Sequence, residues 1–421
     1  MADTFDFVIV GGGIGGLVLA RRLVLGGRSV IVLEADDHLG GTVAKHVVGG
    51  IELDAGAESF ATRGETVAKL ARSLGLGDDI AAPNPEGAWL QPESGAAFRL
   101  PQNSLLGIPG SPMASDVTAI IGRRAGFRAF AETLLPPTVG AKSATLGELV
   151  RRRMGPVVLD KLVRPIARGV HSADPDALPL DQAAPGLRSA MLRTGSLAAG
   201  VLDLRRTSAR AGSAVAGIRG GIFRLVEELQ RDLDRFGVEV RLGERVSSFE
   251  SDSVATSSGS VSGRVVLAAP GLAGVTSAPP TRVVLATLVV DQPLLDEAPR
   301  GTGVLVADGA AEVCARALTH STAKWSWLAE RTGGRHVLRL SYDEPHPDFA
   351  NLARLDAAAL LGVPLEPGAV LDFASVEWYR PPRLSTTPDD IPVAGESIAG
   401  TGLASVVARS EALAGTLLED A

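Results

Sequence analysis

The sequence predicts an α/β fold, and three observations carry that prediction. Residues 7–34 show a short apolar strand, a glycine-rich turn, a helix, a second strand and an acidic residue. Residues 220–270 contain an amphipathic helix, an alternating strand and a last apolar strand. Residues 392–408 place a strand, an acidic residue and a glycine-preceded helix late in the chain. Together they predict a Rossmann-type domain built from discontinuous segments, with a mixed-sheet domain and a helical domain inserted between them.

The composition excludes several classes of protein. Of the 421 residues, 45% are apolar and 21% are charged, which is typical of a globular chain and not of a disordered or collagen-like one. Aromatic residues make up only 4%, which argues against a nucleic-acid binder that stacks bases. The single cysteine, Cys314, excludes an internal disulfide or a cysteine-based metal cluster, so no metal is expected. We expect Cys314 in an apolar core strand.

The charge is unevenly distributed along the chain. The net charge is −7, but residues 121–220 contain 16 basic and 7 acidic residues. A basic segment inside an acidic protein predicts an anionic partner. The arginine triplet at residues 151–153 is interpreted as a solvated helix face or a contact with acidic lipid, and a pocket for the anionic partner is its less favoured alternative.

The first glycine-rich turn has the pattern of a dinucleotide site. Gly11 allows a tight turn, Gly13 lets the backbone approach a pyrophosphate, and Gly16 lets the helix pack on the strand. The free N–H groups at the helix start attract phosphates, and Glu34 lies at the spacing of an acceptor for a ribose hydroxyl. The alternative is a glycine-rich turn without a ligand. The expected contacts are Gly11, Gly13, Ile14, Gly15, Gly16 and Glu34.

A second glycine pair identifies the expected dinucleotide. Gly40, Gly41 and Thr42 follow the acidic residue and resemble the flavin-binding extension of the amine-oxidase-like flavoproteins, although His38 stands where that superfamily usually has arginine. The resemblance implies bound FAD. It also implies that Val246 meets the adenine, that Ala269 lies in a turn close to the cofactor, and that Glu396 meets the ribityl or pyrophosphate region. The helix beginning at Gly402, Leu403 and Ala404 would face the flavin N1–C2=O edge, where its dipole stabilises reduced flavin.

These segments predict three domains. The strands expected in the substrate sheet are residues 282–290, 303–307, 337–342 and 370–376. The predicted FAD-binding domain comprises residues 1–55, 215–275 and 385–421; the substrate-binding domain comprises residues 56–109 and 276–384; the helical domain comprises residues 110–214.

Four further stretches resemble one family, the oxygen-dependent protoporphyrinogen and coproporphyrinogen III oxidases of haem synthesis. They are residues 53–60, 106–109, 163–178 and 319–325. The resemblance implies oxidation of a porphyrinogen to the porphyrin, with O₂ reoxidising FAD and releasing H₂O₂. It leaves open which of the two porphyrinogens is the substrate. The segment 378–390 departs from the family, because it begins Trp-Tyr-Arg-Pro-Pro where the family often has Gln-Tyr-x-x-Gly-His.

A porphyrinogen carries anionic propionates, which suit the forked guanidinium of arginine. Arg168 is therefore a candidate for the substrate pocket, with the solvated helix surface as its alternative. Gly169 would let the macrocycle pass close to the backbone, and His171 is a candidate proton acceptor that can equally be structural. No catalytic acid–base or nucleophile motif is identified.

Two other functions stay open. An FAD amine oxidase or a desaturase has the same fold, although the presence of only two tyrosines counts against the aromatic cage of an amine oxidase. A non-catalytic binding protein on this scaffold is the third possibility. We expect a cytoplasmic protein, because the chain begins without a signal peptide and has no apolar run long enough to span a bilayer. We expect no nucleic-acid partner, because aromatic residues are scarce and the net charge is negative. Peripheral contact with the inner face of the membrane and the oligomeric state are left open.

Overall fold

The computed structural model describes residues 3–420, apart from residues 94, 172, 211–214, 270, 272–278, 383 and 385–389. The chain divides into two compact units. Unit 1 comprises residues 1–82, 215–284 and 376–421, and unit 2 comprises residues 83–214 and 285–375. The boundaries of the three predicted domains stay a prediction.

Unit 1 is built on a six-stranded sheet with the order β12-β2-β1-β15-β14-β13. β1 pairs in parallel with both β2 and β15, and β2 pairs in parallel with β12, whereas β14 is antiparallel to its two neighbours. All four residues of β2 are buried, as expected of a parallel strand covered on both faces. The strands are β1 (Asp3–Val10), β2 (Val30–Leu33), β12 (Glu239–Arg241), β13 (Val246–Phe249), β14 (Ser253–Thr256) and β15 (Gly259–Leu267).

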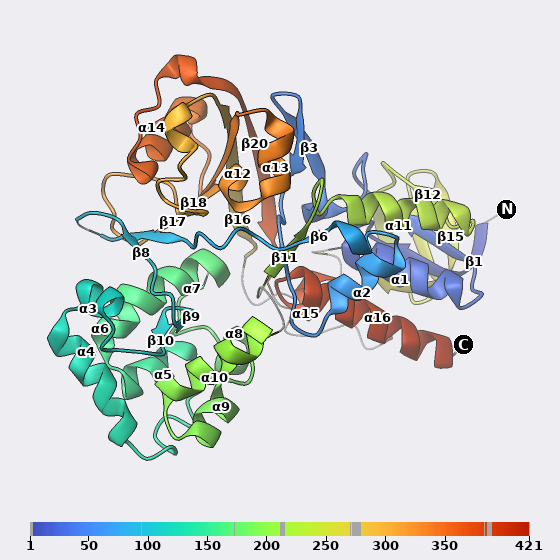
Figure 1. Ribbon diagram of the computed structural model, residues 1–421. Helices are drawn as coiled ribbons and strands as arrows, with labels where there is room; N and C mark the ends of the chain where they lie inside the picture. The colour runs from blue at the N-terminus through green and yellow to red at the C-terminus, as the bar shows by residue number, and fades with distance from the viewer. Residues whose placement is uncertain are drawn as a thin grey trace. The chain divides into compact units, whose positions relative to one another are not determined.

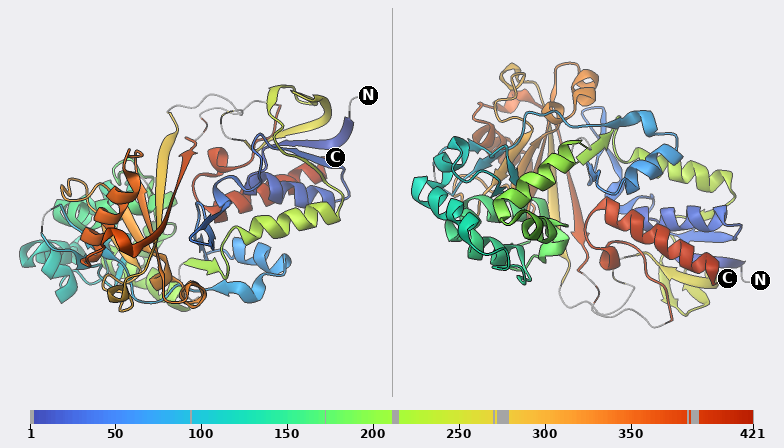
Figure 2. Two further views of the ribbon diagram at one scale, coloured as in Figure 1. Left: turned by 90° about the horizontal axis from the view of Figure 1, so that it is seen from above. Right: turned by 60° about the horizontal axis from the view of Figure 1, so that its bottom comes forward.

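Helices cover one face of this sheet. Helix α1 packs against α11 and α16, and Figures 1 and 2 show these three helices side by side. Phe7, Ile9 and Val32 face them from the sheet, which confirms the predicted strand–turn–helix–strand order. The helices of unit 1 are α1 (Ile14–Leu25), α2 (Thr66–Ser73), α11 (Arg224–Arg235), α15 (Glu396–Ala399) and α16 (Leu403–Glu419).

The third segment of unit 1 joins the sheet where β1 and β15 end. The Leu267 N–H donates to the Pro392 carbonyl over 3.0 Å, and the Ala394 N–H donates to the Leu267 carbonyl over 2.8 Å. Three segments that are distant in the sequence therefore meet at the carboxyl ends of parallel strands, where open α/β sheets bind their ligands. Small strands complete the unit: β3 (Lys45–Val48), β4 (Ile51–Asp54), β5 (Phe60–Ala61), β6 (Ile80–Ala81) and β11 (Val215–Ile218).

A seven-stranded sheet with the order β20-β16-β19-β18-β17-β7-β8 makes up much of unit 2. Residues 281–284 of β16 and residues 376–380 of β20 belong to unit 1. The four predicted strands are confirmed, but β20 continues to Arg380 and is longer than expected. The strands are β7 (Trp89–Gln91), β8 (Phe98–Arg99), β16 (Thr281–Val290), β17 (Gly303–Val306), β18 (Ala317–His320), β19 (His336–Tyr342) and β20 (Val370–Arg380). Helices α12 (Ser321–Lys324), α13 (Ser326–Thr332) and α14 (Phe349–Leu361) belong to the same part of the unit, and α12 and α14 contact β19.

The rest of unit 2 is helical, as predicted for this region (Figure 1). Leu149, Leu162 and Met191 belong to its apolar core. Among the described residues, no helix is both long and apolar enough to cross a membrane. The elements are β9 (Ser104–Leu105), β10 (Ile108–Pro109), α3 (Ser115–Ile121), α4 (Arg123–Phe130), α5 (Leu146–Arg153), α6 (Pro156–Val158), a π-helical segment (Leu159–Val163), α7 (Arg164–His171), α8 (Leu180–Ala183), α9 (Leu187–Thr194) and α10 (Leu197–Arg210).

Two predictions about single side chains are wrong. Arg153 is fully buried and forms an ion pair with the equally buried Glu132 at 2.6 Å. Glu132 also accepts the backbone N–H groups of Leu197 and Ala198 at the start of α10, so the pair connects two helices instead of lying on a solvated face. Cys314 is exposed and lies outside any strand.

Candidate functional site

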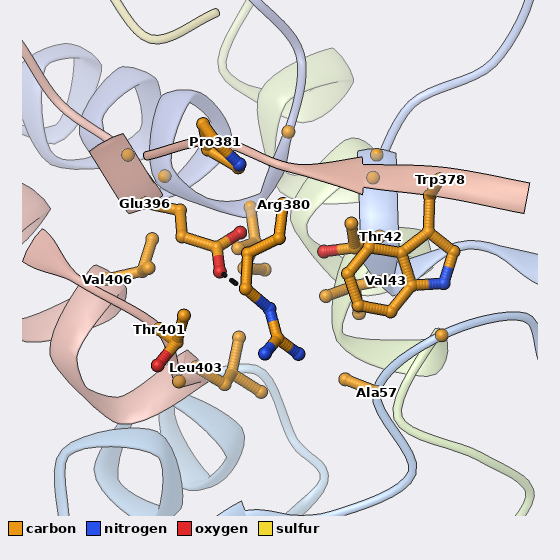
Figure 3. A pocket seen from close by; sticks show the side chains of 18 of the residues that line it. Thr42, Val43, Ala57, Trp378, Arg380, Pro381, Glu396, Thr401, Leu403 and Val406 are labelled. Carbon is orange, nitrogen blue, oxygen red and sulfur yellow. Dashed lines mark ion pairs between the residues drawn. The ribbon is translucent and has the colours of Figure 1, made fainter. Parts of the chain in front are cut away.

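A cavity of about 370 Å³ lies within unit 1, and this volume falls in the range of small-molecule sites. It is formed where the glycine-rich turn, residues 40–43 and the third segment meet (Figure 3). The lining residues are Gly13, Ile14, Gly15, Gly40, Gly41, Thr42, Val43, Gly56, Ala57, Ser59, Ala268, Trp378, Tyr379, Arg380, Pro381, Gly395, Glu396, Ser397, Thr401, Gly402, Leu403 and Val406.

The glycines of the first turn have different surroundings. A Cβ atom on Gly16 would lie 2.1 Å from the Gly11 carbonyl oxygen, so only glycine lets α1 pack this closely on the turn. Gly11 has φ +114° and sits against the backbone of Ala269. A Cβ atom on Gly13 would meet nothing within 4 Å, and Gly13 lines the cavity. Gly11 and Gly16 therefore shape the turn, whereas Gly13 leaves open space for a ligand.

Two long helices, α1 and α16, begin at this cavity. Gly13 is the N-cap of α1 and Gly402 is the N-cap of α16, and neither helix has a side-chain cap. The first N–H groups of an α-helix have no partner inside the helix, and the dipole adds partial positive charge there. The cavity is therefore suited to anionic or acceptor-rich groups of a ligand.

Glu34 stabilises the glycine turn from outside the cavity lining. Its two carboxylate oxygens accept the N–H of Gly12 over 2.6 Å and the N–H of Asp36 over 2.9 Å. Each oxygen keeps a second lone pair, so the carboxylate retains the capacity to accept a ribose hydroxyl.

Most of the residues predicted to contact the cofactor come together here. Those in the lining are Gly13, Ile14, Gly15, Gly40, Gly41, Thr42, Glu396, Gly402 and Leu403. Val246 is buried in the core on the second face of the sheet, and Ala404 packs against the core that contains the helices. These two side chains therefore contribute to packing in the structure, and their contacts with the cofactor stay predictions.

The sequence motifs did not predict the residues that β20 contributes to the cavity. Trp378 and Arg380 line it, and Arg380 approaches Glu396 with its Nε 3.8 Å from the Glu396 Oε1 atom (Figure 3). Burial lowers the pKa of Arg380 and raises that of Glu396, and the attraction between the two charges opposes both shifts. Their only signal in the sequence was the departure from the family pattern at residues 378–390.

The cavity fits a flavin dinucleotide by three features of the chain. Gly13 leaves room for a close approach to the backbone, and two helix N-termini supply N–H donors. The Nε of Arg380 is buried without a hydrogen-bond partner, so a donor is available to a ligand rich in acceptors.

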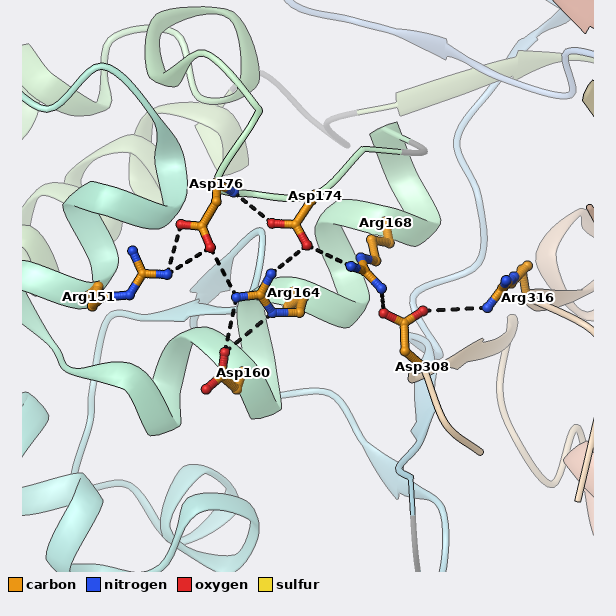
Figure 4. Close-up of polar contacts among 8 residues, drawn as sticks. All are labelled: Arg151, Asp160, Arg164, Arg168, Asp174, Asp176, Asp308 and Arg316. Carbon is orange, nitrogen blue, oxygen red and sulfur yellow. Dashed lines mark hydrogen bonds and ion pairs between the residues drawn. The ribbon is translucent and has the colours of Figure 1, made fainter. Parts of the chain in front are cut away.

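Arg168 lies in unit 2, in a chain of alternating charges (Figure 4). It forms an ion pair with Asp174 at 2.6 Å and a second ion pair with Asp308. Burial raises the pKa of Asp174, but hydrogen bonds from the Asp176 N–H, Arg164 and Arg168 outweigh it and hold the pKa at about 2. The Arg168 guanidinium is therefore already paired with carboxylates. Gly169 and His171 belong to α7, but the structure does not describe the surroundings of Gly169 or the side chain of His171, so both substrate contacts stay predictions.

A second cavity, of about 570 Å³, lies within unit 2. His320 is fully buried, and its Nε2 lies 3.1 Å from the Nδ1 of His336, whose Nε2 lies 3.1 Å from an Asp296 oxygen. Burial, followed by the neighbouring His336, lowers the pKa of His320 to about 3. His320 is therefore neutral at physiological pH.

Comparison with known proteins connects the chain to flavoproteins. A sequence profile of the flavin-containing amine oxidoreductases matches residues 14–294. The coproporphyrinogen III oxidase of Mycobacterium leprae is 27% identical over 96% of both chains. The enzyme of that name from Propionibacterium freudenreichii is 26% identical, over 62% of this chain and 55% of its own length. A solved structure from Exiguobacterium sp., provisionally named a protoporphyrinogen oxidase, matches all of both chains with a TM-score of 0.83 and 22% identity, which supports the predicted fold.

Proposed function

The chain belongs to the family of flavin-containing amine oxidoreductases, and we propose that it oxidises a porphyrinogen, with coproporphyrinogen III as the substrate. The observation that carries this proposal is the match along 96% of both chains with a protein named coproporphyrinogen III oxidase. The cavity in unit 1, with its open Gly13 and two helix N-termini, supports FAD as the cofactor.

FAD supplies the redox chemistry when it is bound, by accepting hydride equivalents from a methylene bridge of the substrate. The residues of this chain bind and orient the FAD. We assign the backbone of Gly13 and Gly15 to the pyrophosphate, and the N-terminus of α16 at Leu403 to the flavin ring. In the proposed reaction O₂ is the final acceptor and H₂O₂ is released.

Arg168 is our candidate for a substrate carboxylate. About 39% of its side chain is exposed, so a ligand can reach it. A propionate would have to replace Asp174 or Asp308, so the net gain is small and Arg168→Ala should raise KM by no more than about tenfold, with FAD still bound. An unchanged KM would make Arg168 a structural residue of the charge network.

The assay that tests the function follows porphyrin fluorescence and H₂O₂ in air. The purified protein is loaded with FAD and given coproporphyrinogen III, protoporphyrinogen IX or a primary amine in separate reactions. We expect the fastest porphyrin formation from coproporphyrinogen III. A rate no higher than spontaneous oxidation with both porphyrinogens, or turnover of the amine alone, would refute the proposal. A faster reaction with protoporphyrinogen IX would correct the choice of substrate.

We also propose that α4 and the 3-10 helix that follows it (Ala131–Leu134) contact a membrane surface. Phe127, Phe130 and Leu134 are 65%, 48% and 85% exposed, and the exposed Arg123 and Arg128 lie on the same helix. Exposed apolar side chains next to arginines are typical of segments that bind anionic lipid surfaces. We expect the protein to sediment with vesicles that contain an anionic lipid, and the Phe127→Ser, Phe130→Ser double variant to remain in solution. Equal sedimentation of both proteins would contradict this.

A further inference from the structure

The Arg380–Glu396 pair lines the cavity of unit 1 but is not part of the glycine motif. We propose that Arg380 positions the flavin dinucleotide: its guanidinium donates hydrogen bonds to acceptor atoms of bound FAD, and Glu396 holds it for that contact. The inference rests on the proposed function only in requiring FAD in this cavity.

The Arg380 guanidinium has donors that no described residue uses. Arginine carries five N–H donors, but its one ion pair among the described residues is with Glu396, at 3.8 Å, which is too long for a hydrogen bond. The Arg380 Nε is buried and has no hydrogen-bond partner. Arg28 and Arg300 also have a buried Nε without a hydrogen-bond partner, but neither residue lines the cavity. Because native structures satisfy most buried donors, the unused donor at the cavity indicates an acceptor that comes from a ligand.

The Arg380 guanidinium lies where a ligand in the cavity can reach it. Arg380 ends β20, and its guanidinium projects into the cavity between the side chains of Leu403 and Trp378 (Figure 3). Its central carbon lies 5.4 Å from the centroid of the Trp378 ring. FAD is rich in acceptors, in its diphosphate, its ribityl chain and the carbonyls of its pyrimidine ring. The planar fork of arginine suits such groups.

Arg380 and Glu396 also balance the charge of the cavity lining. Glu396 alone would repel the diphosphate and the anion of reduced flavin, and its burial makes that repulsion stronger. Arg380 is the one cation among the described lining residues, so it compensates this carboxylate. The other ionisable group of the lining, the Tyr379 hydroxyl, donates to Glu377 over 2.7 Å. The pair therefore lets a carboxylate remain in a site that binds an anion.

The test compares Arg380→Met and Arg380→Lys with wild type. Arg282→Met is the matched control, because Arg282 of β16 forms an ion pair with Glu377 of β20 at 2.7 Å and lies outside the cavity lining. The readouts are the Tm of the FAD-free protein, the Kd for FAD and the midpoint potential of the bound flavin. We expect Arg380→Met to weaken FAD binding by at least about tenfold and to lower the potential, without lowering the Tm of the FAD-free protein. Arg380→Lys should restore part of the FAD affinity and part of the midpoint potential. Arg282→Met should bind FAD with a Kd within about twofold of wild type.

Different results separate this inference from the proposed function. A wild-type Kd and potential in Arg380→Met, or a fall in Tm with no change in Kd, would make Arg380 a structural residue and overturn the inference. Wild-type protein that binds no FAD would overturn both proposals. An FAD-binding wild type that fails to oxidise porphyrinogens, while Arg380→Met still binds FAD more weakly, would refute the proposed function and support the role of Arg380.

Discussion

The variant Gly13→Ala should weaken FAD binding without destabilising the FAD-free protein. Gly13 has φ −67° and ψ 170°, which an alanine adopts without strain, and the added Cβ would meet no atom within 4 Å. Alanine at such a position stabilises the folded protein by about 0.4–1 kcal/mol because it lowers the conformational entropy of the unfolded chain. Alanine is also a poorer N-cap than glycine, which opposes this gain. We therefore expect the stability of the FAD-free protein to change by less than about 1 kcal/mol.

The loaded protein should respond differently. If the pyrophosphate of FAD lies against Gly13, the methyl group occupies its space and breaks charge-assisted hydrogen bonds worth about 1.5–3 kcal/mol each. Loss of one such bond predicts a Kd for FAD raised by about 10- to 150-fold. Flavin fluorescence titration gives the Kd, and thermal unfolding of the FAD-free protein gives the Tm.

Two other glycines serve as controls. The Cβ of Gly16→Ala would lie 2.1 Å from the Gly11 carbonyl oxygen, so we expect overpacking of about 1–3 kcal/mol and a lower Tm already without FAD. The Cβ of Gly415→Ala, on α16, meets nothing within 4 Å and should leave Kd unchanged. The reasoning is refuted if Gly13→Ala binds FAD as wild type does, or if it destabilises the FAD-free protein as much as Gly16→Ala.

Two further predictions concern buried ionisable groups of unit 2. Arg153→Met leaves the fully buried Glu132 without its ion pair and should lower the free energy of unfolding in urea by about 3–5 kcal/mol. The control Arg152→Met breaks an exposed ion pair and should lower it by less than about 1 kcal/mol, and equal losses would contradict a structural role for the buried pair. The pKa of His320 is lowered to about 3, below its unfolded value of about 6.5, so its contribution to stability is complete above about pH 6.5 and is lost as pH falls towards 3. The Tm of His320→Gln should therefore fall less than that of wild type between about pH 7.5 and 5, and parallel curves would exclude His320 as the source.

Local sequence patterns were enough to predict the segments of unit 1 that form the cavity around Gly13. The strand, the glycine turn and the helix are encoded within residues 7–34, because alternation, helical periodicity and glycine conformations act over a few residues. The same reasoning placed Gly402 and Leu403 at a helix start that the structure brings to the cavity of Gly13. The sheet strands were found for the same reason, although β20 extends beyond its predicted end to Arg380.

The sequence by itself therefore determined the fold class, the order of the segments and the glycines at the candidate flavin cavity. Only the tertiary structure decided which charges meet. It pairs Arg153 with Glu132 inside the helical core, Arg168 with Asp308 across unit 2, and Arg380 with Glu396 in the cavity. The sequence alone does not distinguish an arginine on a solvated helix from one in a charge network or in a cofactor site. The role of the arginine depends on burial and on partners distant in the sequence, and no local pattern encodes these.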